Sequence, residues 1–345
     1  MLVKRAFSLR QVAQFSGHHI VWLALLASAV ALPPYFGWFD WISVPWFPIT
    51  VVGTAVAFYV GFKNNSAYDR MWEARKIWGA IINSSRSWGA SVKGFVGNQF
   101  ANPPYSDQEI HAIWQRLLYR HIGWLYALRS QLLMPTSWEH ANQKGVIGTY
   151  ARFYQKEFGV GLVDDQVTPE ELRKFLPANE YERLINYKNT ATQIIDQQSQ
   201  ELAKLREADL IDDFRHMALQ NLLKEFYDHQ GKCERIKKFP LPRQYASMSR
   251  VFVGIFIFLL PFGMVTELGK MGDIGYLLAI PLTVLVGWLY VVMEIVGDYS
   301  ENPFQGMSHD IPMLSLTRVI EIDLREMLGE KDIPPAIEAR KGVLM

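Results

Sequence analysis

An apolar stretch of the sequence carries three residues spaced four apart: Thr54, Phe58 and Phe62. Residues four apart share one face of an α-helix, so these side chains form a stripe. Such a stripe either packs against neighbouring helices as part of a core or lines a pore built from several copies of the helix. In a pore, rings of phenylalanine make a narrow apolar constriction that gates by losing its water. The residues alone leave both interpretations open.

Other reactive side chains form no recognisable catalytic or metal-binding pattern. The sequence has no zinc-protease, P-loop or nucleophile-elbow motif, and its single cysteine, Cys233, excludes an intrachain disulfide. His18 and His19 are adjacent and point in different directions on a helix, which makes them a poor pair of metal ligands. Glu294 lies in an apolar run near its cytosolic end, where an ionisable group has a function, has a structural role or extends to the membrane interface. We therefore expect no enzyme activity, no cofactor and no bound metal.

The composition indicates a membrane protein. The chain of 345 residues is 50% hydrophobic, and its 35 basic and 34 acidic residues give no indication of nucleic-acid binding. A helix spans a bilayer with about 20 mostly apolar residues. The expected membrane segments form two pairs that enclose a long hydrophilic region: about 20–39, 48–66, 247–266 and 274–297.

The hydrophilic sequence, at about 67–245 and 298–345, has helical periodicity and no alternating strand pattern. Its first helix should have Asp107 at the N-cap. Basic residues flank the membrane segments on the same side, among them Lys4, Lys63 and Lys76. By the positive-inside rule, both termini and the hydrophilic region should be cytoplasmic. The sequence therefore predicts an all-α membrane protein with four transmembrane helices and a large cytosolic helical region.

The second membrane segment continues into charged sequence without interruption. The stretch Gly53–Gly79 is apolar in its first half and charged in its second half, and it contains no proline. Because proline is the strongest helix breaker, one helix should leave the membrane and continue into water.

Four motifs, in order along the chain, resemble the bestrophin family in its prokaryotic branch. They are FKNNSAYDRMWEARKIWG after the second segment, MALQNLLKEF in the hydrophilic region, FPLPRQYASM before the third segment and ENPF after the fourth. The resemblance covers about Phe7 to Leu328. It implies a homopentameric ion channel in a lipid bilayer, here the bacterial inner membrane, that passes small monovalent ions. It also implies that the second helix lines a membrane neck and then the wall of a cytosolic vestibule.

The resemblance assigns roles to particular residues. It implies a pore neck at Thr54, Phe58 and Phe62, a cytosolic constriction at Met217, and a structural asparagine–proline step after the last segment at Asn302 and Pro303. Many family members have an aliphatic residue at the first neck position, so Thr54 replaces one apolar ring by a hydroxyl ring.

The segment after Pro303 departs from that of animal members, which hold calcium with a run of acidic residues. Here only Asp310 lies within reach. Because calcium takes six to eight oxygen ligands, several of them carboxylates, we expect no calcium site.

Charge selectivity has two opposing indications. A phenyl ring has a positive edge and a negative face, so edges turned toward the pore axis favour anions and faces favour cations. Asp209, Asp212 and Asp213 either line the vestibule and concentrate cations or form a solvated helix face. Two aromatic rings in the neck lead us to expect a slight preference for anions. The alternative functions are a membrane-anchored scaffold or receptor without transport and a membrane-bound enzyme.

Overall fold

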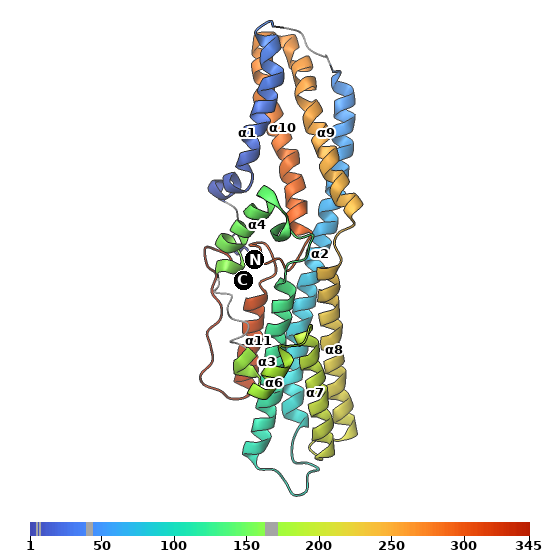
Figure 1. The fold of residues 1–345 in the computed structure, drawn as a ribbon, viewed down its shortest axis with the longest axis vertical. Coiled ribbons are helices and arrows are strands. Elements are labelled where there is room, and N and C mark those ends of the chain that lie inside the picture. The colour runs from blue at the N-terminus through green and yellow to red at the C-terminus, as the bar shows by residue number, and fades with distance from the viewer. Residues whose placement is uncertain (5, 7, 39–43, 163–171) are drawn as a thin grey trace. The chain divides into compact units, whose positions relative to one another are not determined.

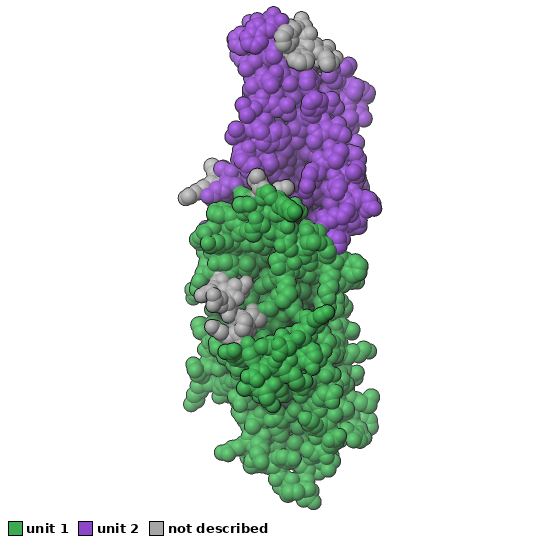
Figure 2. Space-filling view, in the orientation of Figure 1, with its two compact units in different colours: residues 1–3, 72–239, 303–345 green, residues 4–71, 240–302 purple. Residues whose placement is uncertain are grey.

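The computed structural model describes residues 1–4, 6, 8–38, 44–162 and 172–345. The described residues divide into two compact units (Figure 2). Unit 1 comprises residues 1–3, 72–239 and 303–345, and unit 2 comprises residues 4–71 and 240–302. Helices dominate both units, and the pairing between extended residues that the structure describes is confined to isolated bridges at Leu2–Val343 and Arg340–Val343.

Unit 2 contains the four expected apolar helices side by side (Figure 1). They are α1 (Leu9–Tyr35), the first part of α2 (Trp46–Phe95), α9 (Arg243–Leu268) and α10 (Asp273–Ser300), with a short turn of helix, η3 (Gly269–Met271), between the last two. Each of the four is long and apolar enough to cross a membrane. Their shared core is made of these buried residues: Leu23, Ile49, Val56, Val60, Val253, Phe256, Ile257, Leu260 and Val291.

The first helix differs in extent from the first expected membrane segment. A capping box between Ser8 and Gln11 starts α1 well before residue 20. The helix ends at Tyr35, after two successive prolines, and Gly37 then adopts a φ of 65° that only glycine tolerates well. Residue 39, the expected end of the segment, lies outside the described residues.

Helix α2 is one continuous helix of 50 residues, as the absence of proline predicted. A buried seam runs along its whole length in steps of three and four residues, the spacing of one helix face. The seam consists of Ile49, Gly53, Val56, Val60, Lys63, Ala67, Met71, Ala74, Trp78, Ile81, Ser85, Trp88 and Val92.

Unit 1 is built around α3 (Asp107–Leu133), which packs against α7 (Thr190–Glu207), α8 (Asp213–Lys238) and α11 (Met313–Met327). The remaining helices are α4 (Gly145–Phe158), α6 (Ala178–Leu184) and the short η1 (His140–Asn142) and η2 (Val160–Leu162).

The start of α3 lies one residue from the expected position. Ser106, not Asp107, is the N-cap, so the prediction was wrong. The Ser106 hydroxyl accepts from the Glu109 backbone at 3.3 Å, and the Glu109 carboxylate accepts from the Ser106 backbone at 2.8 Å. This reciprocal pair satisfies two backbone donors at once, which Asp107 as cap would not do.

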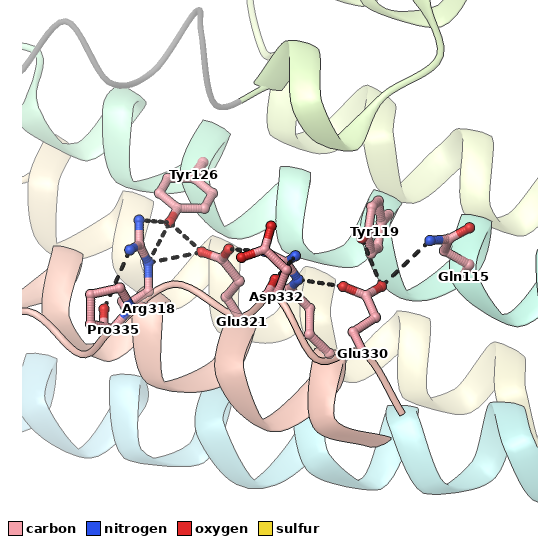
Figure 3. Close-up of polar contacts among 9 residues, drawn as sticks. Gln115, Tyr119, Tyr126, Arg318, Glu321, Glu330, Asp332 and Pro335 are labelled. Carbon is pink, nitrogen blue, oxygen red and sulfur yellow. Dashed lines mark hydrogen bonds and ion pairs between the residues drawn. The ribbon is translucent and has the colours of Figure 1, made fainter. Parts of the chain in front are cut away.

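A polar network binds α11 and the segment after it to α3 (Figure 3). The Tyr126 hydroxyl donates to Glu321 at 2.7 Å, and Arg318 lies 3.0 Å from the same carboxylate. Two turns earlier in α3, the Tyr119 hydroxyl donates to Glu330 at 2.7 Å. Burial raises the pKa of both tyrosines, so their hydroxyls remain protonated donors.

Candidate functional site

The face of α2 opposite its buried seam is exposed along the helix. Phe58 and Phe62 are each 68% exposed, so neither packs in the core of its own chain. This excludes the interpretation of the stripe as an intrachain core. We call this face the α2 stripe; its exposed members are Phe47, Val51, Thr54, Phe58, Phe62, Asn65, Asp69, Trp72, Lys76, Asn83, Ser87, Ala90 and Gly94.

Thr54 belongs to the α2 stripe, and its hydroxyl bonds its own helix. It donates to the Thr50 carbonyl at 2.9 Å, as the Ser66 hydroxyl does to the Phe62 carbonyl at 3.0 Å. Both hydroxyls thus direct their proton to the backbone four residues earlier. A ring of Thr54 residues would therefore be less polar than a ring of hydroxyls that donate to the pore.

The α2 stripe changes chemistry directly after Phe62. The next exposed members are Asn65 and Asp69, and the Asn65 amide donates to the Asp69 carboxylate at 3.3 Å. Lys76 follows two turns later. One face of one helix is therefore mostly apolar up to Phe62 and mixed beyond it, where charges of both signs accompany the exposed Trp72.

Met217 lies in the second turn of α8, in unit 1, and is 64% exposed. Phe214, one turn earlier on the same face, is 85% exposed. Two large apolar side chains at the start of α8 therefore lack a partner within the core of the chain. This is the position that the resemblance assigns to the cytosolic constriction.

The three acidic residues before Met217 have local roles. Asp212 caps α8 by accepting from the Arg215 backbone at 2.8 Å. Asp213 pairs with Arg206, and this hydrogen bond lowers the pKa of the Asp213 carboxyl. Asp209 adopts a φ of 55° in the turn before α8. With Arg206 and Arg215 beside Asp213 and Asp212, this surface carries both signs of charge, which favours a solvated helix face over a cation-concentrating wall.

The segment after α10 is tightly held. Asn302 is buried and its amide donates to Glu301 at 3.2 Å. Beyond the buried Pro303, the Asp310 carboxylate accepts backbone N–H bonds at 2.7–2.9 Å from three residues: Phe304, Gly306 and Ile311. Phe304 has a φ of 72°, a strained value that the bond to Asp310 helps to hold. Asp310 therefore has a structural role in this loop.

A buried lysine supports the same loop. Lys237 lies 2.5 Å from Glu139 and donates to the Phe304 carbonyl at 3.3 Å, and both charged side chains are almost fully buried. Burial lowers the pKa of Lys237 and raises that of Glu139, while each charge opposes the shift of the other. The carbonyl of Phe304 thus has an ammonium group as its cationic partner.

Glu294 is buried in unit 2 and has two partners, so it does not extend to the surface. Its Oε1 lies 2.5 Å from Lys63 Nζ, and its Oε2 accepts from the Ser249 hydroxyl at 2.5 Å. The sequence indicated Lys63 only as one of the basic residues that flank the membrane segments. Its position in the three–four seam of α2 was the available sign that it is buried.

A serine, a glutamate and a histidine meet in unit 1 without forming a catalytic triad. The Ser84 hydroxyl donates to Glu225 at 2.9 Å and lies 3.3 Å from His229 Nε2. In a triad the acid orients the histidine, which then takes the serine proton. Here the Ser84 hydroxyl donates its hydrogen bond to the glutamate and not to the histidine, so this order of roles is absent. Among the described residues, no group of three or more histidine, cysteine, aspartate or glutamate side chains is placed to hold a metal.

Known proteins resemble the chain along most of its length. A family model described as Bacterial/Fungal Bestrophin protein matches residues 11–326. The chain is 26% identical over 303 residues to the voltage-dependent anion channel-forming protein YneE of Salmonella typhi, covering 85% of this chain and 83% of that protein. It is 27% identical over 320 residues to a voltage-dependent anion channel-forming protein of Ralstonia nicotianae, covering 88% and 87%.

A solved structure shares the fold. The crystal structure of a bacterial bestrophin homologue from Klebsiella pneumoniae matches with a TM-score of 0.72 and 20% sequence identity. The match covers 91% of this chain and 98% of that chain.

Proposed function

The chain belongs to the bacterial and fungal bestrophin family, and on this basis we propose that it forms a homopentameric channel for small monovalent ions. Thr54, Phe58 and Phe62 form the neck of the pore, and Met217 forms a second constriction on the cytosolic side. The protein crosses the bacterial inner membrane several times and has both termini in the cytoplasm.

The α2 stripe is the observation that carries this proposal. Exposed Phe58 and Phe62 would also be stable in contact with lipid. The same stripe continues with Asn65 and Asp69, however, and these polar side chains require water. Both requirements are met if several copies of the helix surround a common axis. The phenylalanines then form an apolar constriction, and Asn65 and Asp69 line the water-filled space into which it opens. Gly61, beside the stripe, has no atom near its Cβ position within the chain, which leaves room for a neighbouring copy.

An anion is the permeant ion that we propose. The two relatives described above are named anion channel-forming proteins. Positive phenyl edges at Phe58 and Phe62 would attract an anion in a dry constriction. Beyond the neck, Asp69 and Lys76 offset each other, so the stripe itself adds no strong preference for either sign.

Purified protein in liposomes provides the test. Mass measurement of the detergent-solubilised particle should give five copies. Reconstituted protein should carry ion current in the absence of other proteins, and its reversal potential in asymmetric potassium chloride should lie closer to the chloride than to the potassium equilibrium potential. Pentamers without current would indicate a scaffold or receptor, and a monodisperse monomer or dimer would remove the basis for the neck.

A further inference from the structure

We propose that a charged cluster with a buried ion pair at its centre, next to the neck, positions Phe62, an inference that rests on the proposed channel function. We call it the Lys63 cluster: Lys63 of α2, Ser249 and Arg250 of α9, and Glu294 and Asp298 of α10. All five residues belong to unit 2. The cluster fixes the rotation of α2 about its axis and so fixes the direction of the neck side chains.

Glu294 is the centre of the cluster because it joins three helices. One carboxylate oxygen lies 2.5 Å from Lys63 Nζ, and the other accepts from Ser249 Oγ at 2.5 Å. The Lys63 side chain is 0% exposed, so water does not compete for this contact. Both oxygens of one carboxylate are therefore engaged, each by a different helix.

Asp298 completes the charge balance one helical turn later. It lies 3.7 Å from Lys63 Nζ, and both of its oxygens accept from Arg250 at 3.2 Å. Two cations thus face two carboxylates. Lys63 and Glu294 form the buried part of this group, whereas the Arg250 side chain is 59% exposed. Pairing with an opposite charge is how a charged side chain is tolerated inside an apolar bundle.

A second contact fixes the same part of α2. The Asn64 amide donates to the Met293 carbonyl at 2.9 Å. Gly297 leaves the space that Asn64 occupies, since a side-chain carbon there would overlap the Asn64 amide. Two successive residues of α2 are thus bound to one turn of α10.

The cluster can fix the direction in which the Phe62 side chain points, because Phe62 and Lys63 are consecutive residues of α2. Consecutive residues of a helix differ by about 100° in direction, so fixing Lys63 against α10 fixes the side to which Phe62 points. Apolar packing tolerates small rotations, whereas an ion pair with hydrogen bonds on both oxygens has a defined geometry. Removing the whole pair in favour of apolar residues often leaves stability unchanged, so stability alone does not explain the buried charge.

The decisive variant is Lys63→Met/Glu294→Leu, which removes the ion pair without leaving an unpaired charge. Cys233, the only cysteine, is buried and is replaced by alanine, and Phe62→Cys then reports the direction of position 62. We expect the rate at which a polar thiol reagent modifies position 62 to change about fivefold or more when the pair is removed, and the open probability of channels with Phe62 intact to change by a similar factor. Lys270→Met, which breaks an exposed pair with Glu267 in the same unit, should change neither.

Each result decides the proposal. Unchanged modification and unchanged gating in a folded double variant would overturn it. If the double variant does not fold, the charge exchange Lys63→Glu/Glu294→Lys decides: a folded protein with the original modification rate at position 62 supports positioning, and a second failure to fold shows that the cluster is only structural. The modification rate needs no ion current, so it separates this inference from a failure of the proposed channel function.

Discussion

The two stretches of α2 on either side of the Phe62–Lys63 step differ on one face and agree on the other. The exposed face changes from Phe58 and Phe62 to Asn65 and Asp69, while the buried seam remains mostly apolar throughout. The seam therefore packs along one uninterrupted helix, whereas the exposed face indicates which surroundings, apolar or aqueous, each stretch of the helix faces. The charged exception in the seam is Lys63, which lies at the point where the exposed face changes.

Replacement of the neck phenylalanines should produce the largest effect and tests the first stretch. Phe58→Ala or Phe62→Ala removes five rings from the proposed axis at once and weakens the expulsion of water, so single-channel conductance should rise several-fold. Stability should change little, because both side chains are already exposed. Single-channel recording and thermal denaturation of the pentamer measure the two quantities.

Phe256→Ala is the matched control for these variants. Phe256 is buried in the core of unit 2, and loss of a buried phenylalanine costs about 3–5 kcal/mol. This variant should lose stability without gaining conductance. If the Phe58 and Phe62 variants behave like it, or keep the original conductance as intact pentamers, the comparison between the two faces of α2 fails.

Low pH should lower the stability of the protein around the second stretch of α2, because His121 is buried there in its neutral form. Its Nε2 lies 2.9 Å from the hydroxyl of Ser85 in the seam, and its ring packs on Phe226 with 4.4 Å between centroids. Burial lowers the pKa of His121 to about 3, against about 6.5 for an exposed histidine. The contribution of the neutral His121 to the free energy of unfolding is therefore complete above pH about 6.5. It is lost as the pH falls toward about 3, because only the unfolded chain takes up the proton in this range.

The size of this acid effect follows from linkage. The loss is about 1.4 kcal/mol per pH unit, or about 2 kcal/mol between pH about 6.5 and pH about 5. Denaturation of wild type and His121→Gln across this interval measures it, since the variant should have the flatter profile. Parallel profiles would show that His121 takes up its proton at the same pH in the folded protein as in the unfolded chain, which would contradict the lowered pKa.

Met217→Ala should have the smallest effect and extends the comparison to α8. The side chain is flexible and 64% exposed, so its loss should leave assembly and stability unchanged. We expect a change in the ratio of anion to cation permeability or in rectification, with little change in gating. A conductance increase as large as that of the Phe62 variant would place the main barrier at Met217 instead of the neck.

Local sequence features predicted the continuity of α2 and the spacing of its stripe. The continuity follows from the absence of proline, and the stripe from the period of the helix. The N-cap of α3 was one residue off because Ser106 and Asp107 are both good caps, although the Ser-x-x-Glu spacing to Glu109 pointed to the serine.

The partner of Lys63 could not be predicted in this way. Glu294 lies 231 residues away in the sequence, and which helices pair is decided by packing across the whole unit. The sequence does place a lysine in an otherwise apolar seam and a glutamate in an apolar run, and two such residues of opposite charge in one bundle are candidates for each other. Only the folded structure shows that Lys63 and Glu294 are in contact.

The buried pair of Lys237 and Glu139 has a consequence for the salt tolerance of the loop after α10. Surface pairs such as Arg206 and Asp213 weaken as the salt concentration rises, because the distance over which exposed charges interact shortens from about 8 Å at physiological salt to about 3 Å at 1 M. Lys237 and Glu139 are almost fully buried, so ions in solution screen their attraction far less, and Lys237 continues to donate to the Phe304 carbonyl as the salt concentration rises. If the chain conducts ions as proposed, this loop should keep its structure when the local ion concentration changes, because buried contacts hold it in place.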